Sequence, residues 1–447
     1  MSFTYTGYII ILLGLVAFFF STRWLMAMTI FFIPFTATAV INIGDPGDGS
    51  AIQPYMFLLV MYIVRKNIGF ILLRKFKPSP RIEFTDWVLV LFVAAVFLSL
   101  SMPLIIDGKI TGNVTGRFET FEDIKFNNRN ITQFLYFLLG VIFSFVIKNN
   151  NLTSANLNLS LKIYGYSLIF VLFWGLVDIA CKKLNLPFPE DFFNNSVNPN
   201  AKGFKQVLEG DVNRIASVSV EPSVLAQSVV IYLPFLLLSL KRKVYIFSKI
   251  RDFLLLLALI TFTFATTSFS GGVSVVFVFW VFVALSLKNS IQLLAFSIGT
   301  IFCIVVIYYY FFNNIIFSLA VNKVDSFSGL ERIGTIYNGW ENFLQYPILG
   351  VGWGSITVND LFVKILSSSG IIATVFFLQM IIYIAIRHLS IISKNNENSE
   401  VLYYSESCLF SLIVLLFNSE LNGFLHYFGM FWFILGLNLV NKKQITS

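Results

Sequence analysis

Two charged residues, Arg214 and Glu221, precede an apolar stretch near the middle of the chain, and Pro222 follows them directly. Proline suits the first turn of a helix, so we expect a helix to begin near residue 222 with both charges at its start. A guanidinium group binds phosphate oxygens through paired hydrogen bonds, and a carboxylate can accept a proton. The pattern indicates either an anion-binding and acid–base site or a plain interfacial anchor.

A second arginine, Arg332, opens a stretch whose apolar residues follow helical spacing until Pro347. These residues are Ile333, Ile336, Trp340, Phe343 and Leu344. The spacing predicts an amphipathic helix that lies across the mouth of a helical bundle and carries Arg332 in its first turn.

Glycines at 350, 352 and 354 flank Trp353 just after this helix. Glycine adopts positive φ angles readily and lets a backbone approach a ligand closely, so the run is a candidate binding turn. It matches neither a Walker nor a dinucleotide pattern, and a simple connecting turn is the alternative.

The elements that must position these residues are apolar helices. The 447 residues are 57% hydrophobic and only 12% charged, which is too apolar for a soluble domain and predicts a membrane protein. A span needs about 20 apolar residues, so we predict an all-α polytopic bundle of about 12–14 spans, organised as one membrane domain over residues 1–447. The predicted spans are 5–20, 25–41, 52–73, 87–106, 131–147, 161–181, 222–240, 253–267, 272–287, 291–313, 370–387, 402–418 and 424–440.

Basic residues predict the orientation of this bundle. About 19 of the 31 lysines and arginines fall on alternate short loops, which should face the cytoplasm. The long loops at 107–130, 182–221 and 314–369 should lie outside, so the N-terminus is expected outside and the C-terminus inside. The net charge of +8 reflects this topology, and we expect no nucleic-acid partner.

The order of these motifs resembles a known family. An arginine seven positions before Glu221-Pro222-Ser223, then a large outer loop with Arg332, and then the string Pro-Ile-Leu-Gly-Val-Gly-Trp-Gly at 347–354 resemble the O-antigen polymerase and ligase superfamily. The resemblance covers about residues 210–375, and the string at 347–354 is its most specific part. It implies a GT-C-like glycosyltransferase of the bacterial inner membrane with its active site on the periplasmic side.

The resemblance also implies roles for residues. Arg214 and Arg332 are expected to hold the pyrophosphate of an undecaprenyl-pyrophosphate-linked oligosaccharide, with no cofactor and no metal. Substrate contacts are expected from Gly350, Gly352, Trp353, Asn359, Asp360 and His426, with the glycine turn shaping the floor of the site. The other expected partners are the lipid bilayer and a chain-length regulator.

The chain departs from the ligase branch, which carries a histidine shortly after the Gly-Trp-Gly turn, where this chain reads Thr357-Val358-Asn359-Asp360. The general base is therefore open among Glu221, ranked first, and Glu331, Asp360 and His426. We expect a polysaccharide polymerase. The alternatives are an O-antigen ligase and a lipid-linked oligosaccharide flippase or other transporter.

Overall fold

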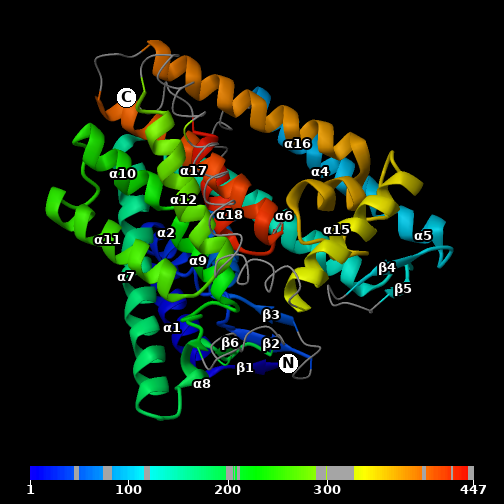
Figure 1. The fold of residues 1–447 in the computed structure, drawn as a ribbon, viewed down its shortest axis with the longest axis horizontal. Helices are drawn as coiled ribbons and strands as arrows, with labels where there is room; N and C mark the ends of the chain where they lie inside the picture. Colours follow the sequence, from blue (N-terminus) through cyan, green and yellow to red (C-terminus); the bar gives the residue numbers. More distant parts are fainter. Residues whose placement is uncertain are drawn as a thin grey trace.

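The computed structural model describes residues 1–44, 50–73, 83–114, 121–197, 205, 207–208, 212–287, 299, 327–394, 399–423 and 426–440. These residues are mostly helical (Figure 1). Six helical segments among them are long and apolar enough to cross a membrane: Phe84–Ile106, Asn128–Asn150, Ser154–Lys183, Pro222–Arg242, Leu361–Lys394 and Ser399–Asn422. Three further apolar helices are shorter: Tyr5–Phe20, Phe269–Ala284 and Gly429–Asn438. The predicted span at 291–313 lies outside the described residues.

The elements of the first half are β1 (Ser2–Phe3), α1 (Tyr5–Phe20), α2 (Thr22–Phe31), β2 (Ile41–Ile43), β3 (Ser50–Ile52), α3 (Pro54–Leu73), α4 (Phe84–Ser99), α5 (Met102–Ile106), β4 (Thr111–Asn113), β5 (Phe121–Asp123), α6 (Asn128–Asn150) and α7 (Ser154–Lys183). Those that follow are α8 (Glu190–Phe193), β6 (Val207–Leu208), β7 (Val212–Asn213), α9 (Pro222–Val230), α10 (Leu233–Arg242), α11 (Lys249–Ala265), α12 (Phe269–Ala284), α15 (Phe327–Gln345), α16 (Leu361–Lys394), α17 (Ser399–Asn422) and α18 (Gly429–Asn438).

The described helices divide into a buried centre and an apolar periphery. Helices α9, α10 and α18 are almost wholly buried, and α17 is largely buried. In α4, α6, α7 and α16, by contrast, fewer than half of the residues in the most apolar stretch are buried. The outer helices expose large apolar side chains such as Trp87, Phe173 and Leu378. Such an apolar outer surface is typical of a bundle whose solvent is lipid.

The prediction of one span over residues 25–41 is wrong in its second half. Helix α2 ends at Phe31, and the chain continues in turns before it joins β2. The backbone of this stretch bonds to other segments, since Ala37 N–H donates to the Val218 carbonyl and the Ala37 carbonyl accepts from Ser196. Non-helical backbone at such a place is tolerated because it is buried in protein rather than in lipid.

Short antiparallel strands were not predicted. Strands β1, β2 and β3 form one small sheet, with Ser2 opposite Asn42 and Ile41 opposite Ile52, and β4–β5 and β6–β7 form hairpins. Each strand has two or three residues, too few for the alternation of apolar and polar residues that marks a strand in a sequence.

Figure 1 shows β1–β3, the β4–β5 hairpin and α15 toward the end of the molecule that lies away from the C-terminus. A small core holds α5, the hairpin, α15 and the glycine-rich turn together at that end: Met102, Ile106, Ile124, Val351, Ile356 and Val358. Charges meet at the other end, where Lys148 pairs with Asp86 at 2.7 Å and Arg242 pairs with Glu406.

Candidate active site

Arg214 lies in the segment that leads into α9, and contacts on both sides fix this segment. Lys182, at the end of α7, donates a hydrogen bond to the Arg214 carbonyl and pairs with Asp178 at 2.9 Å. Asn194 donates to the Ser217 carbonyl at 2.8 Å. The half-buried Arg214 side chain therefore extends from a backbone that is anchored to α7 and to the loop near α8.

Glu221 occupies the N-cap of α9, with extended backbone angles and Pro222 in the first turn, as the sequence predicts. Its carboxylate accepts a hydrogen bond from the Ser223 hydroxyl at 3.1 Å. The carboxylate therefore stays at the helix start.

Arg332 comes from α15 and reaches the end of α17. Its Nη1 donates to the Leu421 carbonyl and lies 3.5 Å from Asn422 Oδ1. The carbonyl groups at a helix C-terminus carry partial negative charge, so a cation is stabilised there. Because α15 already includes Phe327, Arg332 lies beyond the first turn in which the sequence placed it.

The two arginines and the glutamate act on one another electrostatically. Burial lowers the pKa of Arg214, the positive charge of Arg332 lowers it further, and Glu221 opposes both effects. Burial also lowers the pKa of Arg332, again opposed by Glu221. The fold therefore brings Arg214 and Glu221, from one predicted loop, near Arg332, from another. Both guanidinium groups remain charged at neutral pH.

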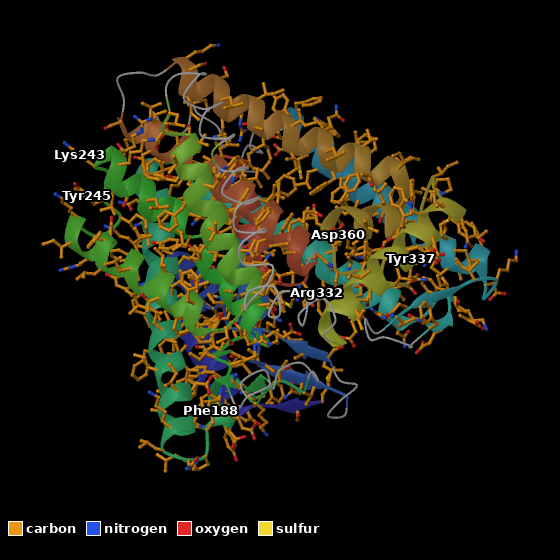
Figure 2. All side chains as sticks on the ribbon, in the orientation of Figure 1. Phe188, Lys243, Tyr245, Arg332, Tyr337 and Asp360 are labelled. Carbon is orange, nitrogen blue, oxygen red and sulfur yellow. The ribbon has the colours of Figure 1, made fainter. Side chains whose placement is uncertain are left out.

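Two carboxyl groups meet next to the chain segment that Arg332 contacts, since Glu420 precedes Leu421. Asp360 caps α16, accepting a hydrogen bond from the Val363 N–H at 2.7 Å, and it is hydrogen-bonded to Glu420 of α17. Glu420 also accepts from the backbone N–H groups of Leu361 and Phe362. These contacts bring the carboxyl groups of Asp360 and Glu420 together at the start of α16. Figure 2 labels Arg332, which belongs to α15, and Asp360, which directly precedes α16.

A second group of cations, which the sequence analysis missed, adjoins the first. Arg129, at the start of α6, donates to the Thr357 hydroxyl at 2.6 Å and to the Val114 carbonyl, and its charge acts on Lys364. Tyr427 links the two groups: burial and Glu221 raise the pKa of Tyr427, and Arg129 opposes the increase. Arg129 lies at the start of an apolar helix, and Arg214 lies shortly before one. A basic residue at such a place is visible in the sequence, so the sequence could have indicated Arg129 as well.

The glycine turn is packed into the protein rather than open to a ligand. Gly350, Gly352 and Gly354 have φ angles of 67°, 100° and 82°, and residues 350–356 are buried. Val351 and Gly352 donate backbone hydrogen bonds to Ser367 and Ser368. A Cβ on Gly350 would lie 2.4 Å from the Ser367 carbonyl oxygen, so glycine is required here by close packing against α16.

Trp353 and His426 lie beneath this turn. Trp353 is fully buried, and its Nε1–H donates to the Gln133 carbonyl. The His426 ring is 1% exposed and packs edge-on against Trp353 with ring centres 4.9 Å apart. Both side chains and the glycine turn are therefore buried in the protein interior. Asn359 is half-buried, and its N–H donates to the Thr335 hydroxyl of α15.

No protein-family model matches the chain, and no curated protein matches it.

Proposed function

We propose that the chain is a surface-polysaccharide polymerase of the O-antigen type. It moves a growing glycan from polyprenyl pyrophosphate to the non-reducing-end hydroxyl of a lipid-linked repeat unit. The observation that carries the proposal is the meeting of Arg214, Glu221 and Arg332 at one end of a bundle of apolar helices. The motif order that resembles the O-antigen polymerases and ligases supports it.

In the proposed reaction the acceptor oxygen bonds to the anomeric carbon of the donor glycan. The bond from that carbon to the phosphate oxygen breaks, and its electron pair leaves with the pyrophosphate. Charge grows on the leaving group, where the guanidinium groups of Arg214 and Arg332 stabilise it through paired hydrogen bonds. The anomeric bond is already activated, so the transfer requires no nucleotide.

A carboxylate accepts the proton of the acceptor hydroxyl. We assign this role first to Glu221, because its carboxylate lies in the same site as both arginines. The pair of Asp360 and Glu420 is the second candidate, since Glu420 precedes Leu421, whose carbonyl Arg332 contacts, and a carboxylate can accept a proton.

The proposed site lies near one membrane face. Along α17, Glu406 contacts Arg242 near the start of the helix and Glu420 lies near its end. Their separation of fourteen positions corresponds to about 21 Å along the helix at 1.5 Å per residue, against a hydrocarbon core of about 30 Å. The basic short loops favour a cytoplasmic location for the Arg242 end, and we place the arginine site at the outer face.

The proposal is tested by complementing a strain that lacks the gene with Arg214→Ala, Arg332→Ala and a control, Arg251→Ala. Arg251 is exposed at the start of α11. We expect both site variants to lose long polysaccharide chains, while the control restores a normal ladder. Normal ladders from both site variants would overturn the proposal. Long polymer left on the lipid carrier would indicate a ligase, and repeat units accumulating on the cytoplasmic face would indicate a flippase.

A further inference from the structure

A polar cleft of about 330 Å³ lies between α15 and the turn that leads into β4. Its lining residues are Gly108, Lys109, Ile110, Thr111, Asn338, Glu341, Asn342 and Gln345. This volume is at the lower end of the range for small-ligand pockets. Such pockets are mostly apolar, whereas Ile110 is the one large apolar side chain in this lining.

One wall of the cleft is a row of hydrogen-bonding side chains on a single face of α15. Residues 338, 341, 342 and 345 follow the helical spacing i, i+3, i+4 and i+7. Asn342 donates to Asn338 Oδ1 at 3.1 Å, and the Asn113 N–H donates to the same oxygen at 3.1 Å. Both asparagines are at least nine-tenths buried, so the base of this wall is fixed before any ligand binds.

The orientation of α15 is the reverse of that in a soluble protein. A row of its apolar side chains is exposed: Leu330, Ile333, Tyr337, Trp340 and Leu344. Ile336, on another side of the helix, packs against the small core. Four of its polar residues line the cleft, and one of them, Asn338, also contacts β4. An interfacial helix places its apolar side in the membrane surface and keeps its polar side for aqueous ligands.

We propose that this cleft is a sugar-binding subsite of the glycan, away from the reacting bond. The inference rests on the proposed function and extends it. Amide and carboxylate groups supply both donors and acceptors, as neutral sugar hydroxyl groups require, and Glu341 and Lys109 give the lining no net charge. A second anion site is therefore disfavoured.

The position of the cleft fits a sugar that is not the one being transferred. Both the cleft and Arg332 belong to α15, with Asn338 and Gln345 about 9 Å and 20 Å farther along the helix axis than Arg332. Thr335 lies between them, donates to the Arg332 carbonyl and accepts from the Asn359 N–H. The subsite would hold a more distant sugar of the donor or acceptor and so select the repeat unit.

The test measures binding of the lipid-free oligosaccharide that mild acid releases from the surface polysaccharide of the source organism. Purified full-length protein is titrated by calorimetry, and saturation-transfer NMR identifies the bound sugar. The cleft variant combines Glu341→Gln and Gln345→Ala, both at exposed positions. The control is Asn128→Ala, which is exposed at the start of α6.

We expect the cleft variant to bind the oligosaccharide about tenfold more weakly, since it removes charged and neutral hydrogen bonds. The control should bind as the unaltered protein does. Equal binding by the cleft variant, or no binding by the unaltered protein, would overturn the inference. The measurement needs no turnover, so it is independent of the ladder experiment that tests the proposed function.

Discussion

Glu221 acts on both Arg214 and Arg332, and its charge opposes the effect of burial on the pKa of each guanidinium group. The sequence predicted these three residues because charges before a proline-led helix and at the start of an amphipathic helix are visible locally. It could not show that Glu420 meets Asp360, or that His426 is covered by Trp353, because these contacts join distant segments.

Replacement of Glu221 by Gln distinguishes a role in proton transfer from a role in binding pyrophosphate. We expect turnover to fall by about 10²–10⁴-fold, the usual contribution of a general base. Inorganic pyrophosphate should still raise the melting temperature in detergent, and by more than in the unaltered protein, because the variant lacks a carboxylate that repels the anion. Sulfate at equal ionic strength is the control. Normal turnover in Glu221→Gln, with loss in Asp360→Asn, would reassign the base to the carboxyl pair.

At the scale of elements, two irregular segments pack against each other next to the site: the glycine turn and the break in α16. Helix α16 contains a break at Gly370, with φ 72° and ψ −175°, and the glycine turn lies against this break. The predicted span of 370–387 begins at this residue, because apolar residues dominate only after it. The sequence therefore indicated the long helix that follows the break, but not the helical residues 361–369 before it, which include Lys364.

Substitution of Gly350 by Ala should destabilise the protein by about 1–2 kcal/mol or more. A left-handed backbone alone has this effect for a residue with a Cβ, and the close Ser367 carbonyl adds to it. Thermal unfolding in detergent measures the change. The matched control is Gly272→Ala in α12, where the nearest atom to a new Cβ is 3.7 Å away. Equal stability of the two variants would show that the turn does not need glycine at 350.

Helix α15 was predicted from its spacing, but spacing alone does not say which face is covered. The structure exposes Leu344 and its neighbours on the apolar stripe and directs residues such as Asn342 inward. Spin labels on single cysteines, in a background without the native cysteines, test this orientation in proteoliposomes. We expect a label at 344 to collide mainly with lipid-soluble oxygen, and a label at 345 mainly with an aqueous nickel complex. Similar accessibility at both positions would contradict an interfacial α15.

At the scale of the whole molecule, the described part of the chain is a helical bundle with different charge arrangements at its two ends. Ion pairs such as Lys148–Asp86 and Arg242–Glu406 join helices at one end. At the other, Arg214, Arg332 and Arg129 gather around Glu221 and Tyr427. Composition and periodicity predicted the bundle and most helix positions. The small sheets and the small core around Met102 and Val351 arise from short segments, some of whose partners are distant in the sequence.

The most direct test of the central claim uses purified protein in proteoliposomes with lipid-linked repeat units. It measures chain lengthening together with release of polyprenyl pyrophosphate. We predict that the unaltered protein and Arg251→Ala release one carrier for each unit added, whereas Arg214→Ala and Arg332→Ala lose about 10²-fold or more of this activity. Undiminished lengthening and carrier release by both variants would contradict the assignment of these arginines to the leaving pyrophosphate.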